Sequence, residues 1–389
     1  MTGDQRDGRP GGRAMRPVVT ALSVVVALVV AWNLAGDAMM SALIFIVILV
    51  SLIVAHEFAH FVTAKMFGVY VHEFGLGFPP RIWGKRIGET EYTLNWLPIG
   101  GFVRLMGEED PTHPRSLASR PRWQRFIVLV AGAATNLVLP VLLFAIAFTI
   151  PHEESIGRAM ITSVFPGAPA AEAGLQVGDV IQSIGGRNAK NVTEAGRYVR
   201  LNLGSDTDIE VRRGDEFVTV TVEPRWTPPE GQGPTGITIA PQFPFTETVS
   251  EPPWESLPNG LRATFDTLVL ARNEIISWIK GGGRPQVAGP VGIAQTTGEI
   301  ARQGGAPPLF ELAALLSINL GIINLLPLPM LDGGRIMFLL VEVARRGKRI
   351  APEKEALVHF VGLVAFLALA AIITFADISR IVRGESLFG

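Results

Sequence analysis

Hydrophobic positions along the chain gather into long blocks that polar segments separate. Five blocks are long and apolar enough to form membrane-spanning helices, at about 18–35, 39–66, 124–150, 309–331 and 355–376. The run from residue 39 to residue 55 contains no charged residue. The pattern therefore predicts a multi-pass α-helical membrane protein with four or five transmembrane helices.

The polar segments between these blocks carry shorter patterns. Apolar and polar residues alternate within 69–106 between glycines, which predicts short strands of a β-hairpin. A soluble α+β pattern begins near residue 161, with a helix near 193–201 and strands at about 206–212 and 216–223. The proline- and glycine-rich residues 225–258 are expected to be a connector, and a helix is expected near 260–280.

Positive charges predict the orientation of the blocks. Lys and Arg gather in the first 16 residues, between the second and third blocks, and at 345–349. The positive-inside rule places all three segments in the cytoplasm, and alternation then places 151–308 outside. The first block is either a retained helix or the apolar region of a signal peptide. A retained helix is favoured because the next block begins a few residues later, which predicts a tight hairpin.

Composition narrows the chemistry. The chain has 389 residues, of which 48% are hydrophobic and 18% are charged, as in a multi-pass membrane protein with a modest soluble part. The net charge of −1 gives no indication of nucleic-acid binding. The sequence contains no cysteine, so disulfides, thiolate ligands and a cysteine nucleophile are excluded. Any metal ion must be bound by His, Asp or Glu.

One motif lies inside the second block: His56-Glu57-Phe58-Ala59-His60. Histidines four residues apart share one face of a helix and can bind one zinc ion, with the intervening glutamate beside the bound water. Ionisable groups at membrane depth are costly and usually functional. We therefore predict His56 and His60 as zinc ligands and Glu57 as a catalytic acid–base. The plainer interpretation is a helix end whose histidines face water or cap carbonyl groups.

A second signature runs from Asn324 to Asp332 and the two glycines that follow (NLLPLPMLDGG). Its two prolines break a helix, and irregular backbone at membrane depth is tolerated where it faces protein or a wet cavity. Asp332 is therefore expected to complete a set of two histidines and one carboxylate, with one position open for water. Alone, Asp-Gly-Gly is only a turn. Asn324 is predicted to donate a hydrogen bond to a developing oxyanion. Alternatively, its side chain donates to backbone carbonyls that the helix break leaves without partners.

With these two signatures, the chain resembles the site-2 protease family of intramembrane zinc metalloproteases, and within it the type of the bacterial regulator of sigma-E protease. The resemblance covers residues from about 39 to the end and depends on the two signatures and on shorter matches at 64–69, 74–78, 100–103 and 289–293. Two departures stand out. Ala133 stands where the family usually has proline, and the helix before Met39 adds to the family's usual four spans.

The external segment resembles a PDZ domain of bacterial envelope proteases, through Ala173-Gly174-Leu175 and Gly178-Asp179-Val180-Ile181. PDZ domains bind extended peptides or chain ends by strand addition. Two uses are open: recognition of a new C-terminus made by an earlier cut, or a filter against bulky external domains, which is favoured. The resemblance implies a bacterial inner-membrane location, lipid contact, and a single-span substrate similar to an anti-sigma factor, with signal-peptide remnants second.

The expected fold is thus a multi-pass α-helical membrane protein with a cytoplasmic β-hairpin element and an inserted extracytoplasmic PDZ domain. Its expected boundaries are a disordered tail at 1–16, an extra N-terminal transmembrane helix at 17–37, the catalytic helix at 38–67, the hairpin region at 68–122, a transmembrane helix at 123–152, the PDZ domain at 155–225, a connector and helix at 226–308, the transmembrane helix with Asp332 at 309–345, and a C-terminal transmembrane helix at 355–377. Two rival functions are a non-catalytic PDZ adaptor and a zinc transporter. The glutamate and the third ligand argue against the adaptor, and the scarcity of polar residues along the spans argues against the transporter.

Overall fold

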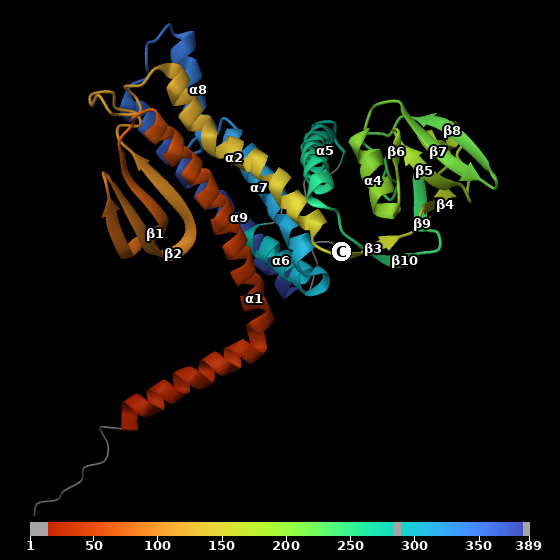
Figure 1. Cartoon of the computed structure of the whole chain (residues 1–389), viewed down its shortest axis with the longest axis horizontal. Coiled ribbons are helices and arrows are strands. Elements are labelled where there is room, and N and C mark those ends of the chain that lie inside the picture. The colour runs from red at the N-terminus through yellow and green to blue at the C-terminus, as the bar shows by residue number, and fades with distance from the viewer. Residues whose placement is uncertain (1–14, 283–288, 384–389) are drawn as a thin grey trace, which may run out of the picture.

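The computed structural model describes residues 15–282 and 289–383, so most of the predicted tail lies outside the described residues. A bundle of long helices forms one part of the molecule, and a β-rich module lies beside it (Figure 1). Among the described residues, four helical segments are long and apolar enough to cross a membrane: 39–66 within α1 (Met15–Met66), α2 (Arg122–Thr149), α7 (Ala306–Leu325) and α9 (Pro352–Val382).

Helix α1 differs from the expected hairpin. It runs without a break from Met15 to Met66, so the turn predicted between 35 and 39 is wrong. The small residues there permit a turn, but no proline interrupts the helix. Its 52 residues would span roughly 78 Å if straight, more than twice the apolar thickness of a bilayer. Figure 1 instead shows a bend between two arms of α1.

Helix α2 lies at the centre of the bundle, in contact with α1, α7, α8 (Asp332–Ala344) and α5 (Pro253–Ile279). Small residues allow these close approaches. A Cβ added at Gly260 of α5 would lie 2.5 Å from the carbonyl oxygen of Val141 in α2. The buried hydroxyl of Ser317 in α7 donates to the carbonyl of Asn136 at 2.8 Å. Pro290–Gly304 forms α6, which packs against α1, α7 and α9.

The predicted hairpin consists of two long strands, β1 (Val71–Ile87) and β2 (Thr90–Leu105). Both strands bend, so that Gly75 pairs with Thr93 on one side and with Phe102 on the other. The resulting antiparallel order across the sheet is 101–105, 71–76, 91–94 and 83–87. The stretch 101–105 is therefore an outer edge of this sheet. It is also close to α1, because a Cβ added at Gly101 would lie 3.7 Å from Cγ of Glu57.

The α+β module contains a six-stranded sheet of order β8-β7-β5-β4-β9, with β6 paired to β5. Its elements are β4 (Ala159–Val164), α3 (Pro169–Glu172), β5 (Val180–Ile184), β6 (Arg187–Asn188), α4 (Val192–Leu201), β7 (Thr207–Arg213), β8 (Glu216–Val222) and β9 (Ile237–Pro241). A buried apolar cluster that includes Ile161, Ile181 and Ile209 forms its core.

The expected connector is partly wrong, because 226–258 contains two strands. Strand β9 pairs with β4 and completes the module's sheet, while β10 (Phe245–Val249) pairs with β3 (His152–Ile156). Each strand has only five residues and lies among prolines and glycines, so the local sequence pattern does not predict it. The module is tied to α5 by an ion pair between Arg187 and Asp266 at 2.6 Å.

A buried carboxylate stabilises the module. Asp179, 1% exposed, accepts hydrogen bonds from the amide of Gln176 at 2.9 Å and from the guanidinium of Arg213 at 2.7 and 2.8 Å. Burial alone would raise the pKa of Asp179, but the two donors outweigh burial and hold this pKa below its ordinary value. The ionised carboxylate therefore stabilises the fold above the unfolded pKa of about 3.9, and this contribution is lost as the pH falls through the lower folded pKa.

We expect Asp179→Asn to destabilise the module by about 2 kcal/mol at pH 7, because it removes charge-assisted hydrogen bonds from a buried site. The difference between the two proteins should shrink as the pH falls from about 3.9, the unfolded pKa, through the lower folded pKa of Asp179, because the wild-type carboxylate then loses its charge as well. Hydrogen exchange of the β5 and β7 amides in the full-length protein measures both effects. The matched control is Asp215→Asn in the exposed β7–β8 turn. Equal exchange rates in the wild type and the Asp179 variant at pH 7 would contradict the argument.

Candidate metal centre

Helix α1 places two imidazoles on the face that packs against α2. His56 and His60 are four residues apart, and they are 6% and 8% exposed. Their rings meet edge to face with centroids 4.8 Å apart. The regular helix thus aligns them as the spacing predicts.

The chain reaches the site again at the first residue of α8. Helix α7 ends at Leu325, and α8 begins at Asp332 after a turn that contains both prolines. The turn is compact because two glycines follow Asp332. A Cβ added at Gly333 would lie 2.1 Å from the carbonyl oxygen of Leu326, and one at Gly334 would lie 2.3 Å from that of Leu328. The expected helix break is therefore present at the end of a candidate membrane span, with the carboxylate at a helix start.

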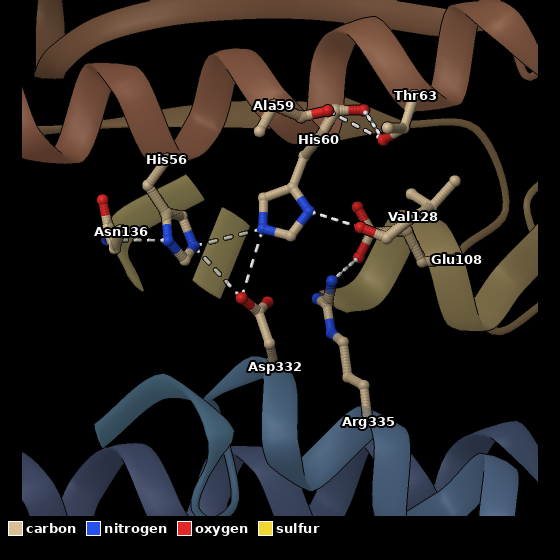
Figure 2. Close-up of polar contacts among 9 residues, drawn as sticks. All are labelled: His56, Ala59, His60, Thr63, Glu108, Val128, Asn136, Asp332 and Arg335. Atoms are coloured by element: carbon tan, nitrogen blue, oxygen red, sulfur yellow. Dashed lines mark hydrogen bonds and ion pairs between the residues drawn. The ribbon is translucent and has the colours of Figure 1, made fainter. Parts of the chain in front are cut away.

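Three side-chain atoms converge at this point (Figure 2). Nε2 of His56 and Nε2 of His60 lie 3.1 Å apart, and Oδ2 of Asp332 lies 3.1 Å from the former and 3.2 Å from the latter. Ligands bound to one tetrahedral zinc ion at ~2.0–2.1 Å lie roughly 3.3 Å from one another. The spacing of the three atoms and their donor types therefore fit a catalytic zinc ion.

The other ring nitrogens contact α2. Nδ1 of His60 lies 2.7 Å from the carbonyl oxygen of Val128 and donates to it, which leaves the lone pair of Nε2 for a metal. Nδ1 of His56 lies 3.2 Å from Nδ2 of Asn136. The buried Oδ1 of Asn136 has no hydrogen-bond partner among the described residues. Rotation of that amide lets Oδ1 accept from Nδ1–H and frees Nε2 of His56 as well. Both contacts are typical of histidines that bind zinc.

The approach of α2 to the imidazoles requires glycine at position 132. A Cβ added to Gly132 would lie 2.4 Å from Nε2 of His60 and 2.6 Å from Nε2 of His56. Those are the two nitrogens that would bind the metal. A side chain at position 132 would therefore occupy the space of the ligand atoms themselves.

A cavity of about 210 Å³ opens onto this cluster. Glu57 lines it beside His60 and Asp332, and the backbone amide of Val103 in β2 donates to the Glu57 carboxylate. Arg335, one turn after Asp332, also lines the cavity and forms an ion pair with Glu108 (Figure 2). The cavity therefore brings the Glu57 carboxylate together with His60, Asp332 and the edge stretch of β2.

The structure brings four of the five predicted site residues together and leaves one apart. Asn324 is half-buried in the last turn of α7, and within the described part of the chain its side chain forms no hydrogen bond and does not line the cavity. Its catalytic role stays a prediction. The sequence alone does not reveal the contacts of Asn136 and of the Val128 carbonyl with the histidine rings. The small-residue run around Gly132, next to a polar residue inside a span, was the available signal.

Two imidazoles and an adjacent glutamate on a candidate membrane span, together with a carboxylate from α8, are typical of a mononuclear metallohydrolase among membrane proteins. The model of peptidase family M50 matches residues 44–369. The chain therefore belongs to this family, that of the site-2 proteases.

Curated relatives agree with this assignment. A "putative zinc metalloprotease" of Clostridium perfringens is 34% identical over 84% of this chain and 95% of its own. The regulator of sigma-W protease RasP of Bacillus subtilis is 29% identical over 87% of this chain and 98% of its own. The zinc metalloprotease RasP of Oceanobacillus iheyensis is 29% identical over 88% of this chain and all of its own. The protein is a zinc metalloprotease.

One solved structure resembles part of the chain. It is the PDZ domain of an SdrC-like protein from Listeria monocytogenes, 26% identical, covering 22% of this chain and 88% of that chain. The TM-score is 0.20.

We expect Gly132→Ala to weaken zinc binding by more than about tenfold, at least as much as the loss of an outer-shell partner, because the added methyl group displaces both imidazoles. Zinc affinity measured by chelator competition on the purified full-length protein tests this. The matched control is Ala131→Ser, at a neighbouring position that lines the opposite groove between α1 and α2. An alanine variant that binds zinc as tightly as the wild type would show that the imidazoles do not need this approach.

Proposed function

We propose that the protein is an intramembrane zinc endopeptidase that cleaves transmembrane segments of single-span membrane proteins. In this proposal His56, His60 and Asp332 bind the zinc ion, and Glu57 is the acid–base. The observation that carries the proposal is the 3.1–3.2 Å triangle of their ligand atoms between α1, a candidate membrane span, and the start of α8. The candidate acid–base Glu57 and the three candidate ligands argue against the adaptor, because a scaffold needs neither.

The chain's residues divide the hydrolysis between them. Zinc held by His56, His60 and Asp332 would polarise the scissile carbonyl and promote ionisation of the attacking water. Glu57 would take the proton that this water loses and pass it to the leaving nitrogen. The amide of Val103 donates to the Glu57 carboxylate and orients it toward the cavity. Family membership and the paired imidazoles support this division of roles.

Substrate binding is assigned to the outer edge of the β1–β2 sheet. A transmembrane helix hides its carbonyls in its own hydrogen bonds, so cleavage needs an extended segment. The stretch 101–105 pairs with β1 on one side only. The amides of Val103 and Leu105 both face away from β1, since they donate to Glu57 and Glu108 respectively. An extended substrate that adds to this edge lies beside the acid–base.

The proposed orientation in the membrane follows from the distribution of positive charge. The Lys- and Arg-rich segments at 68–122 and 345–349 support a cytoplasmic position for the β1–β2 sheet and the near half of the bilayer for the metal. The α+β module, a PDZ domain in this proposal, then lies outside the cytoplasm. We assign the module a filtering role against bulky external domains, and peptide binding by strand addition is its alternative role.

The substrate class follows from one relative. The Bacillus subtilis protein is named as the regulator of sigma-W protease. A membrane-bound anti-sigma factor, already shortened outside by a first cut, is therefore the favoured substrate. Signal-peptide remnants are the second candidate, because they are also short single-span segments.

We expect Glu57→Gln to retain zinc and to cleave a transmembrane substrate ~10²–10⁴-fold more slowly, the usual contribution of general acid–base catalysis. Zinc content and cleavage of a purified single-span substrate in detergent or vesicles are the two measurements. Asp332→Ala is the companion variant, since it should lose the metal as well as activity. Full cleavage by the glutamine variant would overturn the proposal.

Backbone N-methylation of the substrate tests the strand addition. Successive amides of an extended strand point in opposite directions, so methylation should weaken binding to the Glu57→Gln protein at every second position near the cleavage site. Dissociation constants of a series of singly methylated peptides give the pattern. A uniform effect along the peptide, or none, would argue against pairing with the edge 101–105.

A further inference from the structure

Helix α9 contacts the turn that precedes the third ligand. Nδ1 of His359 lies 2.7 Å from the backbone nitrogen of Met330 and accepts its hydrogen bond. Met330 has a φ of +70°, a left-handed conformation that is strained for a non-glycine residue. Such a conformation persists only where neighbouring structure holds it. The imidazole is the group on α9 that holds this amide.

A second contact lies one turn further along α9. A Cβ added at Gly362 would lie 2.2 Å from Cβ of Pro329, so the helix and the turn touch without an intervening side chain. The ring of His359 also packs at 5.5 Å between centroids against Phe338 of α8. His359 and Gly362 are three residues apart and share one helix face, so α9 presents a single surface to the turn and to α8.

The hydrogen bond fixes the tautomer of His359. A neutral imidazole has one donor and one acceptor nitrogen, so a ring that accepts at Nδ1 carries its proton on Nε2. A ring nitrogen of His359 and carboxylate oxygens of Glu109 and Glu355 lie within 4.8 Å of one another, as in a metal site. Neither nitrogen of this tautomer has a free lone pair. The histidine therefore serves the Met330 amide rather than a second metal ion.

We propose that His359 is a positioning residue for the third zinc ligand, acting through the backbone of Met330. The inference rests on the proposed ligand set. Met330 is two residues before Asp332, and the next residue, Leu331, is the extended N-cap of α8. The direction of the chain at Met330 therefore determines where α8 starts and where the Asp332 carboxylate lies. Without the acceptor on α9, the amide of Met330 loses its partner and the strained turn relaxes.

The experiment compares zinc affinities of full-length variants in detergent. His359→Leu removes the acceptor and should weaken zinc binding ~10–100-fold, as the loss of an outer-shell partner does. His359→Asn places an amide oxygen near the position of Nδ1 and should restore most of the affinity. His113→Leu, in an exposed loop, is the matched control and should bind zinc as the wild type does. The absorption spectrum of the Co²⁺-substituted proteins reports whether the carboxylate still coordinates.

Three results would overturn the inference. They are equal zinc affinity in His359→Leu and the wild type, equal losses in the leucine and asparagine variants, and loss of a second zinc ion from His359→Leu with the first retained. Should the leucine variant not fold, His359→Phe keeps the ring against Phe338 and lacks the acceptor, and the same zinc measurement applies. Failure of the ligand set itself is distinguishable, because Asp332→Ala would then bind zinc as tightly as the wild type.

Discussion

The site depends on the close approach of α2 to α1 at Gly132. Two imidazole nitrogens and one carboxylate oxygen can gather within about 3 Å only if nothing else occupies the space around them. A neighbouring helix without a side chain at this point meets that requirement. The approach also brings the Val128 carbonyl and the Asn136 amide against the outer nitrogens of the rings. One missing Cβ therefore determines both the room for a metal and the tautomers that can bind it.

The third ligand needs a different kind of support, because it begins a short helix instead of lying within a long one. At the far end of α8, the buried Glu342 forms ion pairs with Arg122, Arg125 and Arg349 at 2.6–3.3 Å. Two of these arginines belong to α2, so the helix that approaches the imidazoles also holds α8. At the near end, the turn is held by its own glycines and by α9. Asp332 is thus fixed from both ends of its helix, as an outer shell fixes a metal ligand.

The sequence predicted what local physics determines. Long apolar runs indicated the spans at 39–66 and 124–150, and the spacing of His56 and His60 indicated a shared helix face. The proximity of Asp332, 272 residues from His60, was expected from chemistry and resemblance rather than from any pattern. Long-range pairing escaped prediction. Strand β9 exists because β4 pairs with it, and the unbroken α1 shows that small residues permit a turn without imposing one. The role of His359 was invisible because its partner is a backbone amide.

The arrangement also explains why a polar cavity exists in so apolar a chain. Hydrolysis needs water at the metal, and the cavity is lined by Glu57, Arg335 and Glu108 next to the ligands. The ion pair of Arg335 with Glu108 gives each of these two charges an opposite partner beside the cavity. Glu108 also follows directly after the edge strand of β2, so the pair connects the sheet edge to α8. In the proposed function, an extended segment bound along 101–105 would lie beside Glu57, between the sheet edge and the helix that begins at Asp332.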